Sequence, residues 1–171
     1  EMSQTAALTG LYNRRYAMQR LQEEWSKYAR SKDAFSVIMV DIDHFKSVND
    51  QHGHDAGDFV LQSTAKLLQG QCREGEIVCR LGGEEFLVIC SAATQDEAAI
   101  CAERLRAKCE ASIVKFKTFD RAVTLSLGVA GASAEYSNVD ELLKMADQQV
   151  YCAKEGGRNR VCTVAPELQP A

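Results

Sequence analysis

The chain has 171 residues, of which 46% are hydrophobic and 26% charged, and its formal net charge is −4. Such a length and composition are typical of one globular domain. The acidic balance argues against a nucleic-acid polymer as a partner, and no apolar run approaches the ~20 residues that a membrane helix needs.

The ends of the chain and its cysteines indicate its context. Because it begins with Glu1, we expect a fragment of a longer protein whose sensory or regulatory part lies upstream. We expect residues 8–164 to be globular and 165–171 to form a disordered tail. The seven cysteines are odd in number and include no C-x-x-C pair, so they predict neither a disulfide framework nor a zinc site. Reduced thiols favour the cytoplasm, and a membrane anchor elsewhere in the full protein stays open.

The first half of the chain predicts two helices, a strand and a loop. The expected elements are a helix over 11–31, a buried strand over 34–43, a loop or short irregular turn over 44–58 and a helix over 58–69. The strand ends at Asp41 and Asp43, and Asp58 is the expected cap of the second helix.

The second half predicts a hairpin followed by alternating helices and strands. The expected elements are strands over 76–81 and 86–90, a helix over 94–112, a strand over 122–131, a helix over 138–157 and a strand over 159–164. Gly82–Gly83 makes the hairpin turn, and Thr94 caps the next helix with Glu97 three residues on. We therefore predict an α+β fold in which helices pack against a central, mainly antiparallel sheet.

Three carboxylates are expected to meet at one edge of this sheet. Asp41 ends the first strand, and Glu84 and Glu85 lie at the tip of the hairpin. If the two strands are neighbours, these groups could not all stay ionised without a cation between them. Such oxygen ligands suit Mg²⁺, which is often held by one or two carboxylates plus substrate phosphates. A solvated acidic turn is the alternative, but the adjacent glycines admit a ligand to the backbone and favour the metal site.

Six short motifs extend this interpretation to a known family. They are LTGLYNRR (8–15), DIDHFKSVND (41–50), GHDAGD (53–58), RLGGEEF (80–86), SLGVA (126–130) and AKEGGRNRV (153–161). In this order they resemble the GGDEF family, the diguanylate cyclases, with the signature hairpin in its GG-E-E-F form. The resemblance covers residues 8 to about 164.

The resemblance implies a fold and a reaction. The family's fold resembles the palm of polymerases and nucleotidyl cyclases. Its reaction joins two GTP molecules into cyclic di-GMP with loss of two pyrophosphates, across a homodimer in which each subunit holds one GTP. The expected partners are therefore GTP, cyclic di-GMP and a second copy of the chain.

The resemblance also assigns a metal site and a base. Asp41, Glu84 and the Ile42 carbonyl would hold two Mg²⁺ ions, with Mn²⁺ as an alternative metal. Glu84 is also the family's proposed general base, and Glu85 is a weaker metal or structural candidate. Asp43 lies on the same side as Asp41 by strand alternation, but the family gives it no ligand role.

Nucleotide contacts follow from the same resemblance. Asn49 and Asp58 would read guanine, because a carboxylate accepts from guanine N1–H and N2–H, a pattern that adenine lacks. His54 is a further candidate for this pocket. The positions expected to hold the triphosphate are His44 and Phe45, through backbone amides, and Lys46, Lys154 and Arg158, through side chains. Lys46 is also the second residue expected to act in catalysis, and ordinary surface charge is the alternative for these basic residues.

A second site is implied for product inhibition. Many family members carry Arg-x-x-Asp there, where this chain has Arg73 and Glu76, and Arg104 matches a second arginine on a neighbouring helix. Glu76 is one methylene longer than aspartate but keeps the negative charge, so product binding is still expected. The alternative is that these residues form an ordinary solvated loop. This chain departs from the family's Asp-x-Leu-Thr motif, because Ala6 stands where the motif has aspartate. The departure puts in question how the preceding segment is coupled to the domain.

Together these assignments predict an active, Mg²⁺-dependent diguanylate cyclase domain. The alternative is a non-catalytic receptor module for GTP or cyclic di-GMP. Degenerate members usually lose the signature acids, whereas Asp41, Glu84 and Glu85 all remain, which favours the enzyme.

Overall fold

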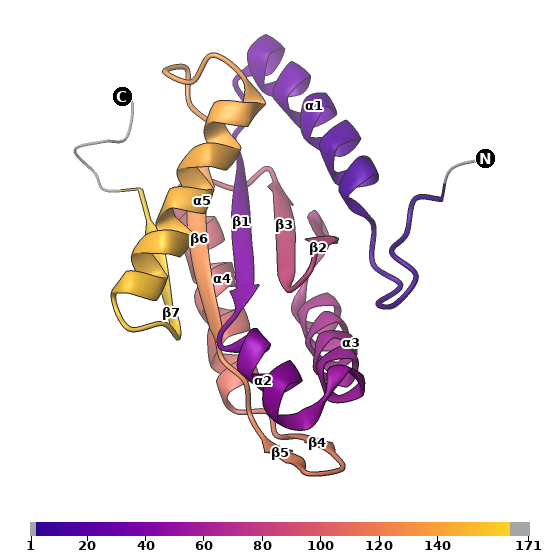
Figure 1. Cartoon of the computed structure of the whole chain (residues 1–171). Coiled ribbons are helices and arrows are strands. Elements are labelled where there is room, and N and C mark those ends of the chain that lie inside the picture. Colours follow the sequence, from indigo (N-terminus) through magenta and orange to yellow (C-terminus); the bar gives the residue numbers. More distant parts are fainter. Residues whose placement is uncertain (1–2, 165–171) are drawn as a thin grey trace.

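A five-stranded sheet with helices on both faces forms the centre of the molecule (Figure 1). The computed structural model describes residues 3–164. The helices are α1 (Arg14–Ser31), α2 (Phe45–His52), α3 (His54–Gln71), α4 (Gln95–Glu110) and α5 (Val139–Glu155). The strands are β1 (Phe35–Ile42), β2 (Glu76–Gly82), β3 (Glu85–Ser91), β4 (Val114–Phe116), β5 (Phe119–Arg121), β6 (Leu125–Gly131) and β7 (Arg160–Thr163).

The sheet is mainly antiparallel, and its strand order is β2-β3-β1-β6-β7. β1 pairs antiparallel with both β3 and β6, whereas β7 runs parallel to β6. This arrangement confirms the predicted α+β fold class. It also makes β1 and the hairpin β2–β3 neighbours, with Asp41 directly opposite Glu85.

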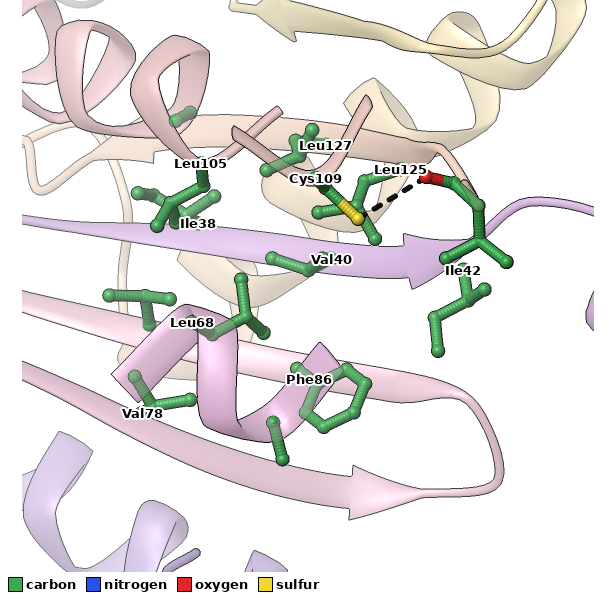
Figure 2. Close-up of a cluster of buried hydrophobic side chains, with 14 of the residues drawn as sticks. Ile38, Val40, Ile42, Leu68, Val78, Phe86, Leu105, Cys109, Leu125 and Leu127 are labelled. Carbon is green, nitrogen blue, oxygen red and sulfur yellow. Dashed lines mark hydrogen bonds between the residues drawn. The ribbon is translucent and has the colours of Figure 1, made fainter. Parts of the chain in front are cut away.

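Alternate residues of β1 divide the core into two layers. Val37 and Met39 pack with residues of α1 and α5, and Ile38 and Val40 pack with residues of α3 and α4. Figure 2 shows the second layer, in which Leu68 of α3 and Leu105 of α4 meet the sheet. In the same view the Cys109 thiol donates to the Val123 carbonyl at 3.4 Å. Burial on both faces explains why the middle of β1, residues 37–40, is continuously apolar.

Several local predictions agree with the structure. Thr94 and Glu97 form the expected reciprocal capping box at the start of α4. α5 ends at Glu155 with Gly156 as its C-cap, in agreement with the predicted end at a glycine. Gly82 and Gly83 turn the hairpin with φ values of 145° and 51°, which glycine adopts readily.

The prediction for residues 44–58 was wrong. This segment is not a loop: α2 occupies Phe45–His52, and α3 begins at His54 after Gly53, whose φ is 90°. Asp58 therefore lies inside α3 and does not cap it. The polar composition misled the prediction because α2 is short and buries few of its residues, Phe45 and Val48 among them.

The remaining differences concern element ends and one small hairpin. The first helix begins at Arg14 instead of residue 11, because Asn13 caps it by accepting from the Tyr16 N–H. The short hairpin β4–β5 was not predicted. The expected tail, 165–171, lies outside the described residues. Within 3–164, no helix is long and apolar enough to cross a membrane.

The segment before α1 is tied to the sheet although Ala6 stands where the resemblance implies an aspartate. Tyr12 forms an isolated parallel bridge with Cys79 of β2 and an antiparallel bridge with Thr5. The Ala6 N–H donates to the Leu11 carbonyl at 2.7 Å, which closes the turn. Backbone hydrogen bonds thus hold this segment against the hairpin.

Candidate active site

The predicted carboxylates lie at the same end of the sheet. The Ile42 N–H donates to the Glu84 carbonyl at 3.3 Å, so the end of β1 is joined to the tip of the hairpin. Asp41 is only 7% exposed. Burial raises the pKa of Asp41 to about 6, and the nearby charges of Glu84 and Glu85 act in the same direction.

The ammonium group of Lys154 forms an ion pair with the Asp41 carboxylate. Lys154 of α5 donates to Asp41 Oδ2 at 2.5 Å, and this ion pair lowers the pKa of Asp41 against the effect of burial. A buried carboxylate that needs a positive partner is chemically suited to a divalent ion. Asp41 and Glu84, with the neighbouring Ile42 carbonyl, therefore fit Mg²⁺ as oxygen donors.

The protein alone supplies an incomplete ligand set. Across residues 3–164, no group of three or more His, Cys, Asp or Glu side chains is arranged to hold a metal ion. Mg²⁺ commonly takes its other ligands from water and substrate phosphates. The donor set thus fits an ion that is bound together with a phosphate-containing ligand.

A cavity of about 260 Å³ collects most of the residues predicted to hold metal and phosphate. It is lined by Asp41, Ile42, Asp43, His44, Phe45, Lys46, Ser47, Glu84, Lys154 and Arg158. Its lining comes from β1, α2, the hairpin turn and the end of α5. Acidic and basic groups thus share one cavity, as a metal–polyphosphate ligand requires.

Glu85 does not line this cavity, although it lies opposite Asp41 in the pairing of β1 with β3. It lines a different pocket, between α1, α5 and the hairpin, together with Arg14, Met39 and Asp140. The two adjacent glutamates therefore line different pockets, with Glu84 among the residues predicted to hold phosphate and Glu85 beside residues of α1 and α5.

The start of α2 presents backbone amides to the cavity. His44 precedes the helix with φ 57°, and its side chain makes no capping hydrogen bond. The first N–H groups of a helix have no intrahelical acceptor and favour anions. Lys46 lies in the same turn with its side chain 88% exposed and paired with Asp50 at 2.9 Å. This geometry is compatible with the predicted phosphate contacts of His44, Phe45 and Lys46.

The residues predicted to read guanine lie where α2 meets α3. A Cβ atom at Gly57 would stand 1.8 Å from Asn49 Oδ1, so the Asn49 side chain rests directly on the Gly57 backbone. Asp58 is the next residue and is exposed, as is His54 at the start of α3. Gly57 therefore brings Asn49 beside the residue that carries the second predicted guanine contact.

The predicted product-inhibition residues also come together. The Glu76 carboxylate accepts from the Arg73 N–H at 2.7 Å and from Arg104 Nη2 at 3.1 Å. Arg104 further donates to the Gln71 carbonyl at 3.0 Å. Glu76 pairs with Cys90, whereas Asp41 pairs with Glu85, so the two sites lie about 17 Å apart along the strands.

One group of residues near the cavity was not predicted from the sequence. Asp43 was given no ligand role, and the structure shows its carboxylate accepting hydrogen bonds from Thr124, Ser126 and Asn159. Asn159 also contacts Arg106 of α4. These residues are far apart in the chain, so no local pattern could have indicated their contacts.

Comparisons with known proteins agree on one family. The model of "Diguanylate cyclase, GGDEF domain" matches residues 3–160. The chain is 40% identical over 163 residues to the response regulator PleD of Caulobacter vibrioides. This alignment covers 94% of this chain and 36% of PleD. The chain is 34% identical over 164 residues to diguanylate cyclase A of Treponema denticola, covering 94% of this chain and 44% of that protein.

A solved structure shows the same fold. The GGDEF domain of DgcB from Caulobacter crescentus, in complex with c-di-GMP, superposes with a TM-score of 0.90 at 29% identity, covering 95% of this chain and 94% of that one. The chain thus spans less than half of each of the two curated relatives, and nearly the whole of the solved domain.

Proposed function

The chain belongs to the diguanylate cyclase family with a GGDEF domain, and we propose that it condenses two GTP molecules into cyclic di-GMP with release of two pyrophosphates. The observation that carries the proposal is the cavity at the end of β1, whose lining includes Asp41, Glu84, Lys154 and Arg158. Relatives named as diguanylate cyclases support the same activity.

The GTP molecule would span two neighbouring regions. Its guanine would bind at the junction of α2 and α3, with Asn49 and Asp58 as the reading groups and His54 at the margin. Its triphosphate would enter the cavity, where α2 offers amides and Lys46, Lys154 and Arg158 offer positive charge. The Asp58 carboxylate can accept from the N1–H and N2–H donors of guanine, so the site would favour GTP over ATP.

Asp41, Glu84 and the Ile42 carbonyl would hold Mg²⁺, with Mn²⁺ as a substitute. When bound, two such ions lower the pKa of the attacking hydroxyl and neutralise the leaving pyrophosphate. Glu84 lies at the hairpin turn and is half-buried, so its carboxylate can accept the proton of the ribose 3′-hydroxyl. Lys154 and Arg158 would neutralise the phosphate charge that develops during the displacement.

The product requires a pair of chains. Cyclic di-GMP contains two equivalent phosphodiester bonds, and the cavity at the end of β1 would receive one GTP. Two chains placed face to face, each with one GTP, would allow each 3′-hydroxyl to attack the other α-phosphorus. An upstream part of a longer protein would regulate this pairing. Because GTP is a cytoplasmic nucleotide, the proposal places the domain in the cytoplasm.

Product inhibition would act at the second site. Arg73, Glu76 and Arg104 are already connected, and arginine binds both phosphate oxygens and guanine faces. The solved DgcB domain is in complex with c-di-GMP, which supports product binding by this fold. The site lies at the far end of the same strands, so inhibitor and substrate can bind at once.

The test is product analysis after incubation with GTP and Mg²⁺ at several protein concentrations. We expect cyclic di-GMP to appear more than linearly with protein concentration, because the active species is a dimer. Glu84→Gln should lower the rate by a factor of 100 or more, on the order of general-base losses. Glu23→Gln, an exposed glutamate of α1, is the matched control and should retain the rate.

Two results would contradict the proposal. A Glu84→Gln variant with nearly the wild-type rate would remove Glu84 from the reaction. Absence of product at every concentration, with cyclic di-GMP still bound, would instead identify a receptor module.

A further inference from the structure

Asn159 joins the turn between α5 and β7 to two other parts of the molecule. The Asn159 N–H donates to Asp43 Oδ2 at 3.0 Å. Its side chain accepts from Arg106 Nη1 at 2.9 Å and donates to Glu110 Oε2 at 2.7 Å. Asn159 is therefore bonded to the end of β1 on one side and to α4 on the other.

This turn has an unfavourable backbone conformation. Arg158 and Asn159 have φ values of 65° and 48°, so two consecutive residues other than glycine are left-handed. Such a conformation costs about 1–2 kcal/mol for an L-residue, and asparagine tolerates it better than most. The hydrogen bonds of Asn159 therefore oppose a tendency of the turn to relax.

Asp43 gives the turn a rigid support. Its carboxylate is only 4% exposed and also accepts from Thr124 Oγ1 at 2.7 Å and from Ser126 Oγ at 2.6 Å. Three donors thus fix a buried carboxylate that lies two residues beyond Asp41. The structure gives Asp43 an anchoring contact with the turn.

Arg106 supports the turn from α4. It pairs with Glu103 at 2.7 Å and Glu110 at 3.0 Å, and its side chain is 17% exposed. Because Glu110 also accepts from Asn159, the three side chains of Arg106, Glu110 and Asn159 form a closed set of hydrogen bonds. A closed set resists rotation of any one member more than isolated bonds do.

We propose that Asn159 is a positioning residue, which, held by Asp43 and the Arg106–Glu110 pair, fixes the left-handed turn and so keeps the Arg158 guanidinium in the phosphate cavity. Arg158 lines that cavity, and Asn159 does not. The inference rests on the proposed function, since it assumes that the cavity receives a nucleoside triphosphate.

A double-mutant cycle separates positioning from general stability. The probe is 3′-deoxy-GTP with Mg²⁺, which lacks the attacking hydroxyl and reports binding without turnover. Asn159→Gly keeps the left-handed backbone accessible and removes both side-chain bonds. We expect it to weaken binding of the probe about tenfold, or about 1.4 kcal/mol. In an Arg158→Ala background the same substitution should change the dissociation constant less than twofold, because its effect passes through Arg158.

Arg106→Ala and Arg20→Ala provide a matched comparison. Arg20 pairs with buried Glu24 at 3.2 Å on α1, so both substitutions break a partly buried i,i+4 arginine–glutamate pair. Both should lower Tm, but we expect only Arg106→Ala to weaken binding of 3′-deoxy-GTP, by about threefold to tenfold. With GTP as substrate, Asn159→Gly should raise KM more than it lowers kcat.

The outcomes distinguish the role of Asn159 from the proposed reaction. The inference is overturned if Asn159→Gly lowers Tm without changing probe affinity, or if it weakens binding equally in both backgrounds. A wild-type protein that binds the probe but makes no cyclic di-GMP would refute the proposed reaction, and the cycle would still decide the role of Asn159. A wild-type protein that binds no probe would overturn both.

Discussion

Gly57→Ala tests the predicted contact between Asn49 and guanine. Gly57 lies within α3, and a Cβ atom there would stand 1.8 Å from Asn49 Oδ1, 2.9 Å from Asn49 Cγ and 3.2 Å from Phe45 Cζ. These distances are below ordinary van der Waals contact, and the Asn49 side chain is the part that can move. The substitution should therefore rotate Asn49 away from its present position.

Stability and binding should respond differently to this change. Replacing a helical glycine by alanine stabilises a helix by about 1 kcal/mol, and an off-rotamer Asn49 costs about 0.5–1.5 kcal/mol. The two effects nearly cancel, so the free energy of unfolding should change by less than about 1 kcal/mol. Loss of the Asn49 contact should weaken nucleotide binding by about 1–3 kcal/mol, because a guanine group is left unpaired.

The assay is titration with 3′-deoxy-GTP, with urea unfolding measured on the same samples. Gly70→Ala is the control, since Gly70 lies on the same helix and a Cβ there meets nothing within 4 Å. Gly70→Ala should raise stability by up to about 1 kcal/mol and leave the dissociation constant unchanged. Unchanged binding in Gly57→Ala would refute the assignment of Asn49 to the guanine.

Further predictions concern inhibition, packing and thiol chemistry. Arg73→Ala should leave the initial rate unchanged and relieve product inhibition, measured as the rate against added cyclic di-GMP; unaltered inhibition would place that site elsewhere. Gly128→Ala should destabilise the protein by about 3 kcal/mol or more in urea unfolding, because the new Cβ would lie 2.2 Å from a backbone oxygen of α5; a loss below 1 kcal/mol would contradict this packing. In thiol labelling followed by mass spectrometry, exposed Cys152 should react first, whereas Cys79 and Cys109 should react only on unfolding. The two buried thiols are unreactive because burial raises the pKa of each to about 12. Early labelling of Cys79 would contradict this prediction and show that the core opens.

The sequence predicted the elements whose signals are local. The apolar run of β1, the double-glycine turn and the Thr94–Glu97 box each specify their structure within a few residues. The meeting of Asp41 with the hairpin depended on a strand pairing that the sequence could only suggest. The structure confirms that pairing, and it brings the predicted metal and phosphate residues together, while their roles stay predictions.

What the sequence missed depends on contacts between distant segments. The helix α2 is too short and polar for periodicity to detect, and it is stable because Phe45 and Val48 enter the core. The bond between Asp43 and Asn159 joins residues 116 positions apart, so neither residue alone indicates it. Glu85 shows a related limit, since only the three-dimensional arrangement separates it from Glu84.

If the cavity binds a cation and a nucleotide as proposed, the ion pair between Lys154 and Asp41 would make the two binding events interdependent. The ammonium group can neutralise the carboxylate or a phosphate, and a divalent ion on Asp41 would release Lys154 toward phosphate. The divalent ion would free Lys154 for the phosphate, and the phosphate would free Asp41 for the divalent ion. By linkage, each ligand would raise the affinity for the other by the same factor. The level of free magnesium would then set how sensitively this domain responds to GTP.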